Sequence, residues 1–406
     1  MRIGPGLYGG KILKRLAKRL VQNWKVAKTT AVLCHRIVPF WSPGYPVLLL
    51  RARGICRTGK FDPAEAFRLG LFQPGFRHPS HVEYVSRRRL TKVQESLNPV
   101  GWAPLLKNKD LFYRYCAAMD VPIPRLYAVV SGGRLPGWTY TGRLLRTRED
   151  WATFFDRELP AEFVVKPVQG AYGRGFNLFR QTGRGYTDAA GVYREAGQVY
   201  DLLVCDAGET YVVQERLHNH PELVRFSGAE ALQTVRMTTF VDNEGQVRLL
   251  HAHWKTIEGS EIVDTFLRGL AGNIEVPADL RHGVLTVANR VPGTGSSVVA
   301  IPTHPKTGIA FKGFALPFWK EACSLAKQTA LKFIPVRTIG WDIGLTPDGP
   351  VVVEGNIWWD PPNQHGDMGE ILRVLTEPSV SGPQQSDPSL DDRDPWRNLF
   401  TGDSRP

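Results

Sequence analysis

The chain alternates between stretches with the hydrophobic period of a helix and stretches with the period of a strand. In residues 11–28, KILKRLAKRLVQNWKVAK, apolar side chains recur every three or four positions, which predicts an amphipathic helix. Further helices are predicted at 62–72, 104–120 and 317–333. Strand-rich segments are predicted at 161–182, 209–217 and 230–315. Helices mixed with short antiparallel strands are typical of an α+β protein.

Two β-rich runs near the C-terminus, 339–345 and 350–360, form the most informative pattern. Between them lies Asp348-Gly349, a dipeptide that favours a two-residue turn, so the runs predict an antiparallel hairpin. The rest of 29–100, apart from the helix at 62–72, is predicted to be irregular because it contains several prolines.

The hairpin places three oxygen-bearing side chains together. Glu354 and Asn356 are two positions apart on one strand, so both point to the same face. Asp342 lies on the partner strand. Two acids and an amide suit Mg²⁺, which keeps some waters and completes its shell with substrate phosphates. The pattern therefore predicts a metal site that serves a nucleoside triphosphate.

A second pattern, FVVKPVQGAYGRGF at 163–176, combines a short strand with a glycine-rich loop. Its glycines are Gly170, Gly173 and Gly175. Glycines allow the backbone N–H groups to approach a polyphosphate closely, and Lys166 and Arg174 add positive charge. The loop lacks a Walker A ending, and its lysine precedes the glycines, so a plain hairpin turn explains it equally well.

A third pattern, in 209–223, is a strand whose polar end suits a nucleotide base. The residues at that end are Gln214, Glu215, Arg216 and Leu217. A strand edge can present backbone groups to adenine, and Glu222, seven residues after Glu215, can accept hydrogen bonds from ribose hydroxyls. A solvated strand end is the alternative. Upstream, Lys109 opens a helix, where a single lysine is usually solvated.

Composition limits the remaining choices. The chain has 406 residues and 42% hydrophobic content, which is enough for more than one packed domain. Five cysteines are scattered without a CxxC pair, which argues against a zinc site or a disulfide framework and indicates a reducing cytoplasm. We expect no secretory signal and no membrane-spanning segment.

The positive charge is concentrated at the N-terminus. The chain has a formal net charge of +12. Residues 1–60 contain 13 Lys and Arg and no Asp or Glu, so the rest of the chain is close to neutral. The helix at 11–28 is therefore expected either to lie on an anionic membrane surface, with Trp24 at the headgroup level, or to pack on its own domain. Nucleic acid is a weaker alternative, because no recognition pattern accompanies the charge.

Taken in order, these elements resemble the ATP-grasp superfamily of carboxylate–amine ligases, which includes D-alanine–D-alanine ligase and glutathione synthetase. The resemblance covers about 105–375. The matching positions are Lys109, Lys166 with Gly170 to Gly175, Glu215 with Leu217, Glu222, and Asp342 with Glu354 and Asn356. The chain is most similar to the sugar-transfer-associated group, which is linked to cell-surface polysaccharides. The phrases that carry this are LQTVRMTTF (232–240), THPKTGIAFKGFALPFW (303–319) and IGWDIGLTPDGPVVVEGN (339–356).

The resemblance implies an ATP-grasp fold, in which two α+β subdomains clamp ATP and Mg²⁺. Lys109 and Lys166 would hold the α- and β-phosphates. Arg236 would stabilise the transferring phosphoryl group or grip the substrate carboxylate. Lys255 is a further candidate, and Arg268 lies in a glycine-containing loop that could close over the site.

The expected domain organisation has five parts. Residues 1–60 form a basic N-terminal segment and 61–104 a small preamble. Residues 105–215 form the first ATP-grasp subdomain, with the glycine-rich loop, and 216–376 the second, with the metal site. Residues 377–406, rich in Pro, Ser, Gln and Asp, are expected to be disordered.

Three functions remain open. The first is an ATP-dependent ligase that joins a carboxylate to an amine on a surface-polysaccharide precursor, in the cytoplasm and peripherally on the inner leaflet. The second is a phosphotransferase that acts on a sugar or alcohol hydroxyl. The third is a non-catalytic scaffold at the membrane surface with a nucleotide-binding fold. The donor, the acceptor and the oligomeric state are not given by the sequence.

Overall fold

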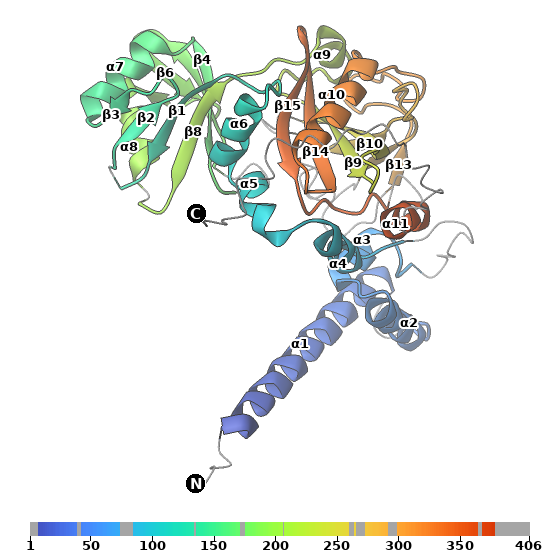
Figure 1. Cartoon of the computed structure of the whole chain (residues 1–406). Helices are drawn as coiled ribbons and strands as arrows, with labels where there is room; N and C mark the ends of the chain where they lie inside the picture. The colour runs from blue at the N-terminus through green and yellow to red at the C-terminus, as the bar shows by residue number, and fades with distance from the viewer. Residues whose placement is uncertain are drawn as a thin grey trace, which may run out of the picture. The chain divides into compact units, whose positions relative to one another are not determined.

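The structure is a computed structural model, shown in Figure 1. It describes residues 7–38, 42–73, 84–133, 135–170, 175–205, 207–259, 264, 273–290, 299–363 and 368–377, without the side chains of 7–20. All the elements described here belong to one compact unit, Met1–Thr376. The tail that we expect to be disordered lies, from residue 378 onward, outside the described residues. The predicted domain boundaries stay a prediction.

The N-terminal region is more helical than expected. Its helices are α1 (Leu7–Ile37), α2 (Tyr45–Thr58), α3 (Pro63–Arg68) and α4 (Arg87–Leu97). The expectation of an irregular 29–100 was wrong, because a proline is compatible with the first turn of a helix, where its missing N–H has no partner to lose. Pro46 occupies such a position in α2, and Pro63 in α3.

The first sheet has eight strands in the order β3-β2-β1-β8-β4-β5-β6-β7, and each strand pairs antiparallel with its neighbours. The strands are β1 (Leu126–Ser131), β2 (Gly137–Thr139), β3 (Leu144–Leu145), β4 (Glu162–Pro167), β5 (Asn177–Thr182), β6 (Gly185–Asp188), β7 (Tyr193–Arg194) and β8 (Thr210–Glu215). Helices α7 (Arg148–Glu158) and α8 (Ala196–Val204) pack on this sheet. They share with it an aromatic core that includes Trp151, Phe155 and Phe163.

The second sheet has seven strands in the order β13-β12-β11-β10-β9-β14-β15, again antiparallel. Its strands are β9 (Thr234–Val241), β10 (Val247–Thr256), β11 (Ile274–Pro277), β12 (Ala288–Arg290), β13 (Val299–Ile301), β14 (Thr338–Thr346) and β15 (Gly349–Asn356). The remaining helical elements are η1 (Val100–Trp102), α5 (Ala103–Lys107), α6 (Lys109–Ala118), α9 (Pro221–Ser227), α10 (Trp319–Lys332) and α11 (Met368–Thr376).

The helix predicted at 104–120 is two helices, separated at Asn108. Asn108 has an extended backbone, and its side-chain oxygen accepts a hydrogen bond from the N–H of Leu111, so the residue caps the start of α6. The first residue of α6 is Lys109. The cap therefore fixes where this lysine leaves the helix.

The predicted hairpin is confirmed, with a turn one residue earlier than expected. Strands β14 and β15 pair antiparallel, and Thr346 is the partner of Gly349, so the turn residues are Pro347 and Asp348. Gly349 has a φ of +122° and already belongs to β15. A φ in this region favours glycine, so a glycine is needed at the first position of β15. The predicted dipeptide Asp348-Gly349 therefore shares only Asp348 with the turn.

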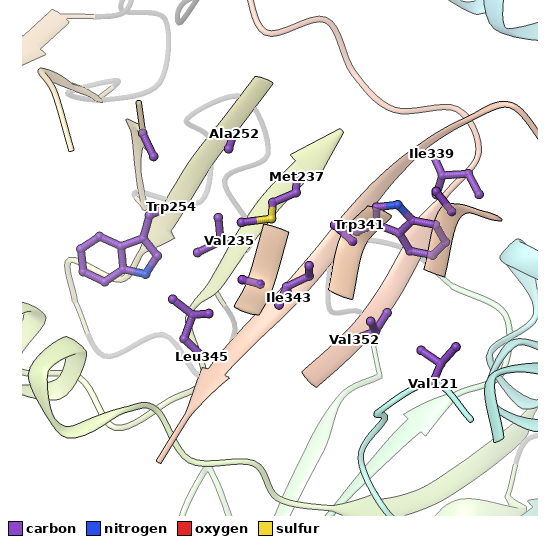
Figure 2. Packing of buried hydrophobic residues seen from close by; sticks show 14 of the residues in the cluster. Val121, Val235, Met237, Ala252, Trp254, Ile339, Trp341, Ile343, Leu345 and Val352 are labelled. Atoms are coloured by element: carbon purple, nitrogen blue, oxygen red, sulfur yellow. The ribbon is translucent and has the colours of Figure 1, made fainter. Parts of the chain in front are cut away.

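The second sheet has one apolar face and one polar face. Figure 2 shows the apolar side chains that gather on it, among them Val235, Met237, Trp254 and Trp341. On the apolar side, helix α10 contacts the four adjacent strands β10, β9, β14 and β15 (Figure 1). Because side chains alternate along a strand, burial of these residues directs Arg236 and Asp342 to the opposite face.

Asn98, just after α4, ties the N-terminal helices to the two strands of the hairpin. Its Nδ2 donates to the carbonyls of Thr338 and Ile357, and its Oδ1 accepts from the backbone N–H groups of Arg337 and Thr338. The side chain is buried. One amide thus satisfies four backbone groups at the beginning of β14 and just beyond the end of β15.

We expect Asn98→Ala to lower the free energy of unfolding by about 2–4 kcal/mol, because it leaves several buried backbone groups without partners. Urea denaturation followed by circular dichroism measures this. Ser96→Ala, at an exposed residue of the same helix, is the control and should change stability little. Equal stability of the Asn98→Ala variant and the native protein would contradict the proposed anchor.

Candidate active site

A cavity of about 1690 Å³ is lined by both sheets. Strands β4 and β8 of the first sheet contribute Lys166 and Gln214, and strands β9, β14 and β15 of the second contribute Arg236, Asp342 and Glu354. The cavity therefore brings together side chains that are far apart in the sequence.

The glycine-rich turn and two lysines form one part of the cavity lining. The backbone N–H of Lys109 donates to the carbonyl of Val168 at 2.9 Å, and its Nζ donates to the carbonyl of Gly170 at 3.0 Å. Gly175 has a φ of +70°, and a Cβ there would lie 2.6 Å from Cγ of Pro167. A glycine is thus required where the loop returns to the strand. Gly173 and Arg174 lie outside the described residues.

Lys166 is held in the cavity with an altered acidity. Burial lowers the pKa of Lys166 to about 8, and the positive charge of Lys109 acts in the same direction, whereas Glu354 opposes both. A lysine with this pKa still carries a charge at neutral pH, but it has lost much of its hydration. Both properties favour the binding of an anionic group.

The end of β8 contributes a second part of the lining. Gln214 to Leu217 all line the cavity. The Oε2 of Glu215 accepts from the backbone N–H of Arg125 at 3.0 Å, and Arg216 forms an ion pair with Glu162. Gln214 is buried, and its Oε1 has no hydrogen-bond partner in the described part of the chain. An unpartnered polar atom beside a cavity suits a ligand donor.

Glu222, predicted as a ribose ligand, is not brought to the cavity. It lies exposed in the first turn of α9, where its backbone N–H is capped by His220. The residue spacing alone did not show that a helix starts at Pro221 and turns this side chain elsewhere. Glu230, beyond α9, lines the cavity instead.

A row of charged side chains crosses the polar face of the second sheet. His253, Arg236, Asp342 and Glu354 are consecutive cross-strand partners on β10, β9, β14 and β15. Directly opposed residues of antiparallel strands share a face, so the pairing register determines this row.

Asp342 is the centre of the row. Its Oδ1 lies 2.6 Å from Nε of Arg236 and 3.1 Å from Nζ of Lys255, and its Oδ2 lies 3.0 Å from Nη2 of Arg236. Burial alone would raise the pKa of Asp342, but the two cations outweigh it and hold this pKa well below its usual range. Arg236, which needs an anionic partner on a buried strand, therefore has one.

Asp264 completes the cluster from a different segment. Its Oδ2 accepts from the backbone N–H of Thr234 at 2.7 Å and from Oγ1 of Thr234 at 2.5 Å, and it lies 3.6 Å from Nζ of Lys255. Burial would lower the pKa of Lys255, but Asp264 and Asp342 together raise it. Lys255 thus remains a cation in the cavity. The predicted loop residue Arg268 lies outside the described residues.

Glu354 and Asn356 fit a divalent cation. Both line the cavity, and no hydrogen bond or ion pair engages the Glu354 carboxylate within the described ranges. The Nδ2 of Asn356 donates to the carbonyl of Gly340 and to Asp342, which leaves Oδ1 as an acceptor. Two oxygen ligands of this kind suit Mg²⁺ that takes its other ligands from water and phosphate.

Asp342, the third predicted ligand, lies beside them, but its oxygens are engaged by Arg236 and Lys255. In the part of the chain that the structure describes, no three His, Cys, Asp or Glu side chains are placed to hold a metal. Its role as a metal ligand therefore stays a prediction.

Sequence reasoning missed several residues of the cavity. Asp264 and Glu275 carry no local motif, and only their distance from Lys255 and His253 reveals them. Glu65 and Arg87 also went unrecognised, because they meet the segment after β15 only in the folded chain. A buried cation such as Lys255, which requires an acid nearby, was the one signal that could have pointed to Asp264.

Two antiparallel sheets thus share one cavity, whose lining includes two lysines, a glycine turn and the carboxylate and amide oxygens of Glu354 and Asn356. The chain belongs to the sugar-transfer associated ATP-grasp family, whose model matches residues 88–365. The predicted ATP-grasp fold and the predicted family are therefore confirmed. No curated protein matches the chain.

Solved structures give more distant likenesses. The ADP complex of an N5-carboxyaminoimidazole ribonucleotide synthetase has a TM-score of 0.38 and 12% identity, and the match covers 72% of this chain and 58% of that one. D-alanine–D-alanine ligase from Helicobacter pylori has a TM-score of 0.36 and 12% identity, with 67% and 60% covered. L-amino acid ligase from Bacillus licheniformis has a TM-score of 0.33 and 12% identity, with 79% and 56% covered. The chain thus spans less than two thirds of each of these proteins.

We expect ADP affinity to fall by up to about tenfold per pH unit as the pH rises above about 8. The reason is that Lys166, whose pKa burial lowers to about 8, loses its charge there in the free protein. Fluorescence titration with ADP in EDTA measures this without metal. Lys166→Arg, which stays charged, should remove the pH dependence. The same fall in both proteins would show that another group is responsible.

Proposed function

We propose that the protein is an ATP-dependent ligase that joins a carboxylate to an amine. The observation that carries this is the position of Arg236 and Lys255, two cations that contact Asp342 in the same cavity as Lys109 and Lys166. Arg236 uses Nε and Nη2 for Asp342, so its Nη1 is left to meet an anion in the cavity. A substrate carboxylate held there would lie next to the transferring phosphoryl group.

The proposed reaction has two steps. A carboxylate oxygen attacks the γ-phosphorus of ATP and the bond to the β-phosphate oxygen breaks, which gives an acyl phosphate and ADP. The amine then attacks the acyl carbon, the carbon–oxygen bond to phosphate breaks, and the amine proton is lost to solvent. Lys109 and Lys166 would stabilise the negative charge on the phosphates of ATP. Arg236 and Lys255 would stabilise the negative charge on the phosphoryl group while it is transferred to the carboxylate.

Glu354 and Asn356 would hold Mg²⁺, which when bound neutralises charge on the terminal phosphates. The finer proposal is that the product decorates a precursor of a cell-surface polysaccharide. It is supported by the family description, which names sugar transfer.

Incubation with ATP, Mg²⁺ and candidate donors and acceptors should release equal amounts of ADP and phosphate. We expect Glu354→Gln to reduce this turnover by about 100-fold or more, since it weakens a ligand that acts on the charge of the transition state. Circular dichroism should show an unchanged fold. Glu244→Gln, at an exposed acid in the turn after β9, is the matched control.

The products distinguish the alternatives. Formation of ADP with transfer of the phosphoryl group to a hydroxyl, and without free phosphate, would identify a phosphotransferase instead. Absence of nucleotide binding by calorimetry would leave the non-catalytic scaffold.

We also propose that the N-terminal helices bind an anionic membrane surface. No helix in the described ranges is long and apolar enough to cross a bilayer. On α1 the Trp24 side chain is 62% exposed, with Nζ of Lys28 at 5.2 Å from its ring, and on α2 Val47 and Leu50 are also exposed. Exposed apolar side chains among basic residues, with no acid in 1–60, favour a negatively charged interface.

Trp24→Ala combined with Lys28→Glu should reduce sedimentation with vesicles that contain phosphatidylserine by about tenfold, since it removes an interfacial anchor and reverses a charge. Turnover of soluble substrates should be unchanged. Leu135→Ala, at an exposed leucine elsewhere in the fold, is the control. Vesicle binding that does not respond to the double substitution would remove the membrane proposal.

A further inference from the structure

The cavity is larger than a nucleotide site requires. Pockets that enclose one drug-sized ligand typically measure about 300–1,000 Å³, whereas this cavity measures about 1690 Å³. The cavity is thus large enough for a second ligand of similar size.

Part of the cavity is built by residues outside the family match. Glu65 and Arg68 come from α3 and Arg87 from the start of α4, all before residue 88. The segment that follows β15 faces them with Trp358 and Asp360. We call these five residues the acceptor wall.

The acceptor wall is a connected piece of structure. The Oε1 of Glu65 accepts from the backbone N–H of Arg87 at 2.9 Å, and the Nε of Arg87 lies 3.0 Å from Oδ1 of Asp360. Close by, the Asn363 amide exchanges two hydrogen bonds with the backbone of Val85. These contacts hold α3, α4 and the segment after β15 together.

The acceptor wall is within reach of the proposed chemistry. Asp360 follows Asn356, a proposed metal ligand, by four residues, and four residues span at most about 14 Å. A ligand that rests on the wall can therefore extend one of its groups to the phosphoryl group that Lys166 and Glu354 would hold.

The charges of the acceptor wall indicate a neutral ligand. Its two arginines balance its two acids, so it attracts neither an isolated anion nor an isolated cation strongly. Planar donors and acceptors side by side suit hydroxyl groups, which do both. Trp358, half-buried beside them, adds an apolar ring and an N–H donor.

We propose that the acceptor wall binds a neutral sugar ring, with its hydroxyls on Glu65, Arg68, Arg87 and Asp360 and one face of the ring on Trp358. This inference rests on the proposed function, since it identifies the molecule that carries the acceptor amine as a carbohydrate. Trp359, the next residue, is buried and donates from Nε1 to Oγ1 of Thr338. It is part of the core and has no place in the sugar site.

Saturation-transfer NMR with the methyl glycosides of glucose, galactose and N-acetylglucosamine tests this without ATP or metal. At least one glycoside should bind in the millimolar range, and Trp358→Ala should weaken it about tenfold, which corresponds to about 1.4 kcal/mol. Asp360→Asn should weaken it as well, which keeps the test valid if Trp358→Ala fails to fold. Inorganic phosphate and ethanolamine, the charged comparison probes, should not compete.

Asp201→Asn is the matched control, because the Arg148–Asp201 pair also lies at 3.0 Å with similar exposure but does not line this cavity. ADP titration of each variant reports separately on the nucleotide end and should be unchanged. Normal ADP binding with no glycoside bound, or competition by either charged probe, would overturn the sugar site and leave the ligase proposal standing. Glycoside binding in a protein that binds no nucleotide would overturn the ligase proposal and leave the sugar site standing.

Discussion

The buried ion pairs of Asp342 are the interaction on which the rest of the site depends. Arg236, Lys255 and Asp342 lie on the polar face of one sheet, and Asp264 joins them from a separate segment. Buried charges are costly unless each is paired, and removal of one leaves the others uncompensated. The cluster is therefore a unit, and its geometry determines which groups remain for a ligand. Nη1 of Arg236 is such a group, and the carboxylate of Glu354 is another.

The apolar face of the same sheet determines where this cluster lies. Val235 and Met237 flank Arg236, and Trp341 and Ile343 flank Asp342, and all four are buried against the core under α10. A slip of one residue would bury the charges and expose these side chains, so the register is strongly determined. The site is thus a consequence of packing on the other side of the strands. The pairing of β14 with β15 shifts register between Asp342 and Ile343, and such a bulge can redirect the side chains beside it.

Patterns that are local in the sequence predicted the hairpin and many of the residues that line the cavity. Alternation along 339–356 gave the hairpin and the common face of Glu354 and Asn356, because a strand period of two needs no distant contact. The pairing of Arg236 with Asp342 could not be predicted, since it joins residues 106 positions apart. Glu222 was misplaced for a related reason: spacing in sequence does not reveal that α9 begins at Pro221.

The acceptor wall is a second case in which contacts between residues far apart in the sequence could not be predicted from local patterns. Arg87 and Asp360 are far apart in sequence, and neither lies in a recognisable motif, yet they form one ion pair beside the cavity. Anchors such as Asn98 make this possible, since they attach the N-terminal helices to the strands that carry the proposed metal ligands. In the proposed assignment the sheets supply the phosphate chemistry, while α3 and Arg87, which precede the family match, help to shape the second ligand site. Changes in α3 and α4 should consequently alter the choice of acceptor before they alter nucleotide binding, because the contacts of the lysines and of Asp342 do not involve those helices.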